Sequence, residues 1–275
     1  MGARLDTQRH EMDKHGSPPP NPAHWPDLQG LVAMLFISRS GSSAMARHIT
    51  EHFDGGIVRE SLNISPLARQ RAEYETADLT EALKRHVQDN AASGWFAFKA
   101  GPFGLASGEL TGFTERYQHL FRYILLLRRD IIAQAVSITM ARATGLYHSG
   151  QQERRPLQED DFKPDEIMRH MQQITQGSRA LRDYIAISGR PWRAVLYEDF
   201  DRGNCGPLDH ALREFGLPER TNLRRLKKAP LERVTRAENA IWVERMRTGL
   251  DDSGRALIRD YQDFVDRTLA ESAAQ

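Results

Sequence analysis

A short polar turn, RSGSS at residues 39–43, follows a strongly apolar run of strand length and precedes a segment with helical spacing. A helix that starts after such a turn presents unpaired backbone N–H groups, which bind anions. The arginine can add positive charge, and the hydroxyls of Ser42 and Ser43 can bind anion oxygens. The anion ligands singled out in this turn are Arg39, Ser40, Gly41, Ser42 and Ser43. The alternative is a simple connection, because short motifs recur by chance.

The turn departs from the nucleotide-binding pattern GxxxxGK[ST] at two positions. When Gly41 is aligned with the second glycine, Phe36 replaces the first glycine and Ser42 replaces the lysine. A nucleoside-phosphate kinase that binds ATP with Mg²⁺ would lack its phosphate-binding lysine. The turn therefore argues against such a kinase, which stays one alternative function.

A second polar group follows the apolar run FRYILLL at residues 121–127. Arg128, Arg129 and Asp130 come next, and Ser137 lies eight residues after Arg129. A helix that starts near Asp130 would place Ser137 on the same face, about two turns along. A guanidinium and a hydroxyl so placed can hold one phosphate. Singly, Arg128 is compatible with a surface cation, and Ser137 with a hydroxyl bonded to its own helix.

Hydrophobic patterns predict the elements that position these groups. Buried strands are predicted at 31–37, 95–100, 121–128 and 192–200. Helices are predicted after the first turn and at 79–88, 130–145, 167–185, 208–215 and 257–269. Strands that alternate with helices pair in parallel through crossovers. We expect a three-layer α/β fold with a central parallel sheet flanked by helices.

Composition and charge exclude several classes of protein. The 275 residues are 40% hydrophobic and 27% charged, as in folded proteins with a substantial core. Lys and Arg number 38 against 37 Asp and Glu, so no nucleic-acid partner is expected. The polar, proline-rich residues 1–27 predict a flexible tail, and 28–275 form the expected domain.

Cysteine content and hydropathy bear on the cellular compartment. Cys205 is the only cysteine, so the sequence predicts no internal disulfide and no cysteine-based zinc site. No run approaches the roughly 18 apolar residues of a membrane span, and the start of the sequence lacks a secretory h-region. A cytoplasmic protein is expected.

One competing motif is HITEH at residues 48–52, which matches the HxxEH pattern of one class of zinc peptidases. Its two histidines lie one helical turn apart, with Glu51 available as a base. A third ligand cannot be assigned from the sequence. A helix with Met45, Ile49 and Phe53 toward the core explains the segment better, and no metal is expected.

In order along the chain, the motifs resemble those of sulfotransferases that use 3′-phosphoadenosine-5′-phosphosulfate. The resemblance is closer to the bacterial trehalose 2-sulfotransferase-type family, spans about residues 30–250, and implies a P-loop-like sulfotransferase fold. The motifs are RSGSS (39–43), FAFK (96–99), LRRDIIAQAVS (127–137), TGLYH (144–148), LYEDF (196–200) and WVERM (242–246). Pro102 departs from the aromatic that usually trails the FAFK strand, and the stretch between Phe53 and Leu79 matches loosely.

The resemblance implies how the donor is bound. The turn at 39–43 would hold the 5′-phosphosulfate, and Arg129 with Ser137 would hold the 3′-phosphate. Arg233 lies in a basic segment from Arg224 to Arg247 and would close on the nucleotide. This family needs no metal.

The resemblance also implies roles in the transfer step, for Glu60, Lys99 and Arg39. Glu60 falls where the family places the base for the acceptor hydroxyl, although a solvated loop acid is the alternative. Lys99 would steady the transferred sulfuryl group, and His148 with Glu60 would contact the acceptor. Sulfuryl transfer requires positioned donors and a base of these types.

The expected acceptor is a hydroxyl of a carbohydrate, glycolipid or small metabolite. The stretches 149–166 and 55–77 would shape its pocket. The resemblance also implies a homodimer. Besides the kinase, a non-catalytic nucleotide-binding module is a second alternative. Such a module would retain the donor residues and would need neither Glu60 nor Lys99.

Overall fold

The structure, a computed structural model, describes residues 25–147, 151–222 and 237–275. It contains the strands β1 (Gly30–Leu35), β2 (Trp95–Ala100), β3 (Phe121–Leu127) and β4 (Trp192–Leu196). They form one sheet in the order β2-β1-β3-β4, and every neighbouring pair is parallel. The predicted parallel pairing is confirmed.

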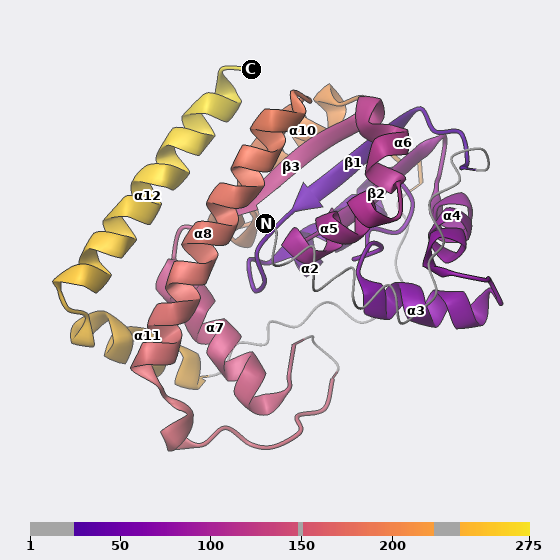
Figure 1. Cartoon of the computed structure of the whole chain (residues 1–275). Coiled ribbons are helices and arrows are strands. Elements are labelled where there is room, and N and C mark those ends of the chain that lie inside the picture. Colours follow the sequence, from indigo (N-terminus) through magenta and orange to yellow (C-terminus); the bar gives the residue numbers. More distant parts are fainter. Residues whose placement is uncertain (1–24, 148–150, 223–236) are drawn as a thin grey trace.

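Helices cover both faces of this sheet, which confirms the expected three-layer α/β fold (Figure 1). Before β3 they are α2 (Ser42–His52), α3 (Ile64–Glu73), α4 (Leu79–Asn90), α5 (Pro102–Leu110) and α6 (Phe113–Tyr117). After β3 they are α7 (Ile131–Thr144), α8 (Pro164–Ser188), α9 (Tyr197–Asp201), α10 (Gly206–Glu214), α11 (Ala237–Gly249) and α12 (Asp252–Ala273). Short 3-10 turns lie at Gln118–Leu120 and Glu159–Asp161.

The two faces of the sheet bury separate cores, because successive residues of a strand point to opposite sides. Leu31, Ala33 and Leu35 of β1 belong to the larger core, with α3 to α8, α11 and α12. Val32 and Met34 belong to the smaller core, with α2 and α10. All six residues of β1 are buried, which explains why its sequence is apolar without alternation.

Local capping explains where α7 begins and ends. The Asp130 carboxylate accepts a hydrogen bond of 2.9 Å from the backbone N–H of Ala133. The helix stops at Gly145, whose φ of 74° lies in the left-handed region that favours glycine. The helix predicted over 130–145 is therefore confirmed, and Ser137 lies in its middle.

The strand predicted at 192–200 is wrong in its second half. β4 ends at Leu196, and the chain turns into the short helix α9. The Glu198 carboxylate accepts hydrogen bonds from the backbone N–H groups of Arg129 at 3.1 Å and Asp130 at 3.0 Å. Glu198 thus links the start of α9 to the residues just before α7. These two hydrogen bonds form where the sequence predicted a continuing strand.

Trp25 lies within the stretch that the sequence assigns to a tail, yet it is only 5% exposed. Its ring packs edge-on against Phe113 and Tyr117, with both centroid distances 5.8 Å. The Tyr117 hydroxyl donates a hydrogen bond to the Pro26 carbonyl oxygen. The packed core therefore includes Trp25, and residues 1–24 lie outside the described residues.

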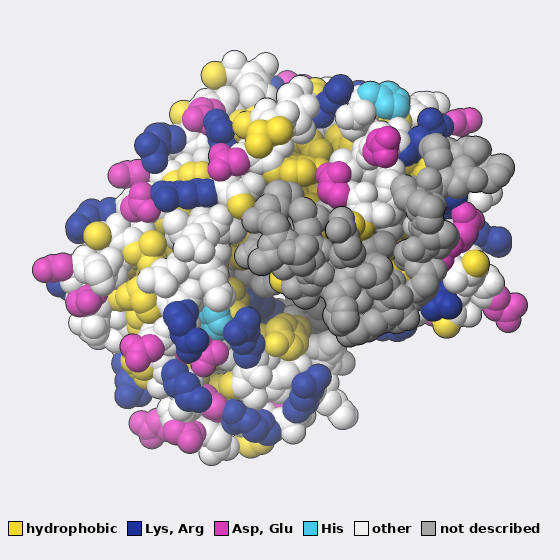
Figure 2. Space-filling view, in the orientation of Figure 1, with side chains coloured by type: hydrophobic (Ala, Val, Ile, Leu, Met, Phe, Trp, Pro, Cys, Tyr) yellow, Lys and Arg dark blue, Asp and Glu magenta, His cyan; other side chains and the backbone are white. Residues whose placement is uncertain are grey.

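Charged side chains of both signs are scattered over the face shown in Figure 2. Basic side chains gather over the lower part of this view, where Figure 1 places α7, α11 and the segment between α7 and α8. The exposed large apolar side chains are Phe103 on α5, Ile187 on α8, Ile241 on α11 and Tyr147, which follows the end of α7. Within the described parts of the chain, no helix has both the length and the apolar character needed to cross a membrane.

Candidate functional site

The turn at 39–43 lies at the edge of the sheet where the parallel strands end. Arg39 has a φ of 64° and Gly41 a φ of 85°, so both adopt left-handed backbone conformations. Such a φ is uncommon for a residue other than glycine and is often found at functional sites. A Cβ atom on Gly41 would lie 2.1 Å from the Tyr197 ring, so glycine is required there. Gly41 also has no side chain to bond the first N–H groups of α2.

Two guanidinium groups meet at this turn. Arg39 donates from Nε to Ser137 Oγ at 2.9 Å and from Nη1 to the Tyr147 carbonyl at 2.5 Å. Arg128 donates from Nη1 to the Arg39 carbonyl at 3.0 Å, and its Cζ lies 4.8 Å from the Tyr197 ring centroid. Burial, and next the charge of Arg128, lower the pKa of Arg39. Two cations therefore lie together, and neither forms an ion pair with any carboxylate of the described residues.

Two buried polar atoms at this turn have no hydrogen-bond partner among the described residues. They are Ser40 Oγ and Arg128 Nε. Ser40 is only 1% exposed. Leaving a buried polar atom unsatisfied costs about 1–3 kcal/mol, so a ligand that bonds these atoms would stabilise the site.

Lys99, at the end of β2, supplies a third cation. Its Nζ lies 3.3 Å from Ser42 Oγ, 3.1 Å from Ser43 Oγ and 3.2 Å from Glu60 Oε1. The side chain is 8% exposed, and burial lowers the pKa of Lys99 while Glu60 opposes this shift. A lysine of the neighbouring strand thus brings its charge to the start of α2, whereas the turn itself contains no lysine.

Glu60 lies on a segment that runs beside β2, since the Lys99 N–H donates to the Arg59 carbonyl at 2.9 Å. One carboxylate oxygen contacts Lys99, and the other accepts a hydrogen bond of 2.5 Å from Asn63 Nδ2. Its side chain is 31% exposed. The carboxylate is held in place and still reaches the surface, as a base for an incoming hydroxyl requires.

The structure does not bring Arg129 and Ser137 together. Arg129 Nη2 pairs with Asp266 Oδ1 on α12 at 2.7 Å, and this contact raises the pKa of Arg129. Ser137 instead accepts its hydrogen bond from Arg39. From the sequence alone, Arg128 was compatible with a surface cation, but the structure places it against the turn at 39–43. The signal for its position is strand alternation, because adjacent residues at a strand end point to opposite sides.

A recess of about 10 Å³ lies beside Arg39 and Ser137, which is space for one water molecule. Leu146 and Asn239 line it as well, so the start of α11 closes this side of the turn. The expected ligands Arg233 and His148 lie outside the described residues.

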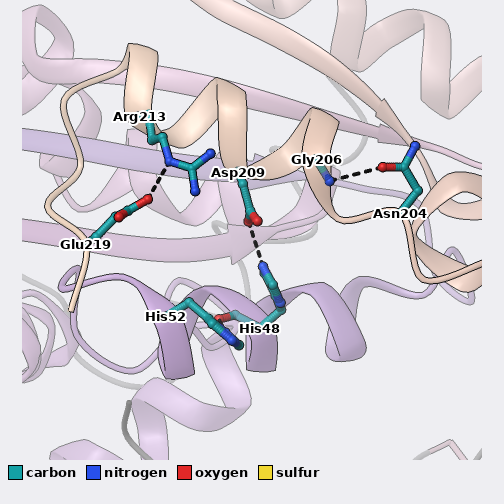
Figure 3. Close-up of polar contacts among 7 residues, drawn as sticks. All are labelled: His48, His52, Asn204, Gly206, Asp209, Arg213 and Glu219. Atoms are coloured by element: carbon teal, nitrogen blue, oxygen red, sulfur yellow. Dashed lines mark hydrogen bonds and ion pairs between the residues drawn. The ribbon is translucent and has the colours of Figure 1, made fainter. Parts of the chain in front are cut away.

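The HITEH segment lies on α2, away from the contacts of the turn. His48 Nε2 is 2.6 Å from Asp209 Oδ1 on α10, and Figure 3 shows the imidazole directed at this carboxylate. His52 Nδ1 is 3.0 Å from the His48 carbonyl oxygen, and the two rings stack at 4.3 Å. Among residues 25–147, 151–222 and 237–275, no group of three His, Cys, Asp or Glu side chains is placed to hold a metal ion. The pair links α2 to α10.

A buried histidine lies behind the Glu60 segment. His86 of α4 is 2% exposed, and its Nε2 lies 2.9 Å from Ser61 Oγ. Its Nδ1 lies 2.8 Å from Gln70 Nε2 and 3.1 Å from Asn90 Nδ2. Burial, and next the positive charge of Arg59, lower the pKa of His86 from 6.5 to about 4, although Asp89 opposes the shift. His86 is therefore neutral at physiological pH.

This shift predicts a pH-dependent stability. Between pH 6.5 and about 4 the unfolded chain takes up a proton at His86 that the folded chain does not. The contribution of neutral His86 to the free energy of unfolding is fully present above pH 6.5. It is lost as the pH falls toward 4 and changes little below that pH. The advantage of wild type over His86→Gln should shrink by roughly 3 kcal/mol between neutral pH and pH 4. Urea unfolding at several pH values measures it, and a constant difference would contradict the assignment.

The family assignment comes from a comparison of the whole sequence. A family model described as Stf0 sulphotransferase matches residues 107–249, just over half of the chain. The chain belongs to this family. The matched range contains Arg128, Arg129 and Ser137 of the Stf0 sulphotransferase domain. The turn at 39–43, Glu60 and Lys99 lie before the matched range and rest on their own geometry.

Two solved structures are similar to this Stf0 family member. A sulfotransferase domain from the Synechococcus PCC 7002 olefin synthase has 13% identity and a TM-score of 0.48, over 89% of this chain and 98% of that one. A sulfotransferase domain from the curacin biosynthetic pathway has 14% identity and a TM-score of 0.45, over 86% and 98%. A comparison with curated proteins gives no match. The family assignment therefore rests on the family model.

Proposed function

We propose that this Stf0 sulfotransferase moves a sulfuryl group from 3′-phosphoadenosine-5′-phosphosulfate to a hydroxyl of a carbohydrate, glycolipid or small metabolite. The observation that carries the proposal is the placement of Arg39 and Arg128 at the turn without a carboxylate among the described residues. Two like charges repel in a partly buried site, and a bound anion reverses this cost. A phosphosulfate placed between these groups supplies the missing negative charge.

The donor's 5′ end would bind at the start of α2. Backbone N–H groups of the turn, the Ser42 and Ser43 hydroxyls and the side chain of Arg39 would hold the phosphosulfate oxygens. Lys99 already contacts both hydroxyls, so its ammonium would lie beside the same oxygens. The unpartnered Ser40 Oγ and Arg128 Nε fit a ligand rich in oxygen.

The transfer step requires a base and a stabilised leaving group. Glu60 would take the proton of the acceptor hydroxyl as its oxygen attacks sulfur in line. The bond between sulfur and the bridging phosphate oxygen breaks, which leaves a sulfate ester and 3′-phosphoadenosine-5′-phosphate. Lys99 would donate to the sulfuryl or bridging oxygens, on which negative charge develops. The ion pair between Lys99 and Glu60 would keep the carboxylate close to the proposed donor.

The donor's 3′-phosphate would bind Arg129 and Ser137, as the family pattern implies. Arg129 must then exchange Asp266 for the phosphate, because Asp266 holds it in this structure. Arg233 would close on the nucleotide and His148 would contact the acceptor. A homodimer remains a prediction.

The experiment that tests the donor is calorimetric titration with 3′-phosphoadenosine-5′-phosphate, the product left after transfer. Binding that depends on the 3′-phosphate supports the proposal. Binding of MgATP in its place would favour the kinase alternative.

A further inference from the structure

The segment that carries Glu60 is tethered on both sides of this residue. On one side the Arg59 carbonyl accepts a hydrogen bond of 2.9 Å from the Lys99 N–H. On the other side the Ser61 hydroxyl lies 2.9 Å from His86 Nε2. Glu60 is thus held between β2 and α4, and the second tether is made by side chains alone.

The hydrogen bonds around His86 assign the proton on its ring. Asn90 Nδ2 donates to the His86 carbonyl at 2.9 Å, so this atom is an amide nitrogen. The same nitrogen lies 3.1 Å from His86 Nδ1, which must therefore accept. The neutral ring then carries its proton on Nε2 and donates it to Ser61 Oγ. His86 acts on Ser61 as a hydrogen-bond donor.

Both partners of this bond are buried, which makes it hard to replace. Ser61 and His86 are each 2% exposed. If one partner is removed, water cannot readily reach the other, and the remaining polar atom is left without a hydrogen bond. A displacement of the segment that carries Glu60 would relieve this cost. Glu60 would move with Ser61, since the two residues share a peptide unit.

We propose that His86 is a positioning residue for the transfer reaction, which holds the Glu60 carboxylate against Lys99 through its hydrogen bond to Ser61. This inference rests on the proposed function of Glu60. His86 does not contact the reacting atoms and takes no proton from them. Its effect is geometric, and a displacement of about 1 Å at a catalytic group can cost up to roughly 100-fold in rate.

The first test compares His86→Leu, Ser61→Ala and His86→Gln. The leucine and alanine variants should lower kcat roughly tenfold and leave the affinity for 3′-phosphoadenosine-5′-phosphate within about twofold, because the donor ligands are untouched. The glutamine amide can donate from about the position of Nε2. It should therefore restore kcat to within about threefold of wild type.

Thr80→Val is the matched control on the same helix. Thr80 is 3% exposed, and its hydroxyl has no hydrogen-bond partner among the described residues. The control should leave kcat unchanged, and melting temperatures of all variants identify losses due to unfolding alone. Unchanged kcat in His86→Leu, or a failure of a stable His86→Gln variant to restore it, would overturn the inference.

A second readout does not depend on activity. Glu60 raises the pKa of Lys99, opposing burial. If Glu60 moves away in His86→Leu, the Lys99 pKa measured by NMR should fall in the same direction as in Glu60→Gln, and His86→Gln should restore it. An unchanged Lys99 pKa in His86→Leu would overturn the positioning role even if the protein transferred no sulfuryl group. Absence of transfer and of donor binding in wild type would instead overturn the proposed function.

Discussion

Glu60→Gln is expected to lower turnover roughly 100-fold or more and to leave the affinity for 3′-phosphoadenosine-5′-phosphate within about twofold. The amide keeps the shape of the side chain and can still accept from Asn63 Nδ2, but it cannot take a proton. The donor ligands at the turn are unchanged. Release of 3′-phosphoadenosine-5′-phosphate from the donor measures turnover, with the carbohydrate acceptor that gives wild type its highest rate.

Glu81→Gln is the matched control for this variant. Glu81 pairs with Lys84 at 2.6 Å, and the Lys84 side chain is 5% exposed, similar to the buried Lys99 beside Glu60. The pair lies on α4, outside the proposed site. The control should retain full turnover. A Glu60→Gln variant that turns over at the wild-type rate would remove Glu60 from the mechanism.

Arg39→Ala and Arg129→Ala are expected to separate the two ends of the donor. Arg39→Ala should weaken both AMP and 3′-phosphoadenosine-5′-phosphate at least roughly tenfold, because a hydrogen bond to a charged group contributes about 1.5–3 kcal/mol. Arg129→Ala should weaken only the ligand that carries a 3′-phosphate, by at least roughly tenfold. Arg128→Ala should behave like Arg39→Ala, since Arg128 holds the Arg39 carbonyl. Calorimetric titration of each variant with both ligands measures these losses.

Arg182→Ala controls for the general loss of positive charge. Arg182 pairs with Glu271 at 2.5 Å and lines the same surface recess as Trp192, the first residue of β4, so it lies toward the opposite end of the strands from the turn. It should bind both ligands as wild type does. If Arg129→Ala leaves both affinities unchanged, Arg129 stays with Asp266 and does not bind the donor. If Arg39→Ala leaves AMP binding unchanged, the turn is not the 5′ site.

The strands and α7 were accessible from the sequence because local signals determine them. β1, β2 and β3 are mostly apolar and almost fully buried, and their observed limits lie within two residues of the predicted ones. α7 has an aspartate cap and a terminal glycine. The sequence missed α3, α5, α6 and α11. α5 contains Gly104 and Gly108, which are poor helix formers, and a Cβ on Gly104 would lie 3.0 Å from Asn63 Oδ1. Close packing, which local pattern does not report, explains this helix.

In the candidate site, the positions of Lys99 and Arg129 depend on parts of the chain that are distant in the sequence. The strand order β2-β1 explains why Lys99 reaches the turn after β1, and the order itself depends on how the chain crosses over. The direction of Arg129 depends on Asp266 of α12, far away in the sequence. The sequence spacing suggested that Arg129 and Ser137 share one helix face, but α7 begins at Ile131 and the Arg129 guanidinium pairs with the distant Asp266. The position of Arg128 likewise depends on residues distant in the sequence, because it bonds the Arg39 carbonyl and lies over the Tyr197 ring.

The most direct test of the donor assignment is calorimetric titration of the purified wild-type protein with 3′-phosphoadenosine-5′-phosphate, beside AMP and MgATP. We expect micromolar binding of the bisphosphate, at least roughly tenfold weaker binding of AMP, and no binding of MgATP at the same site. Binding of MgATP without binding of the bisphosphate would contradict it and favour a nucleoside-phosphate kinase. Absence of binding by all three would contradict the assignment of the turn at 39–43 as a nucleotide site.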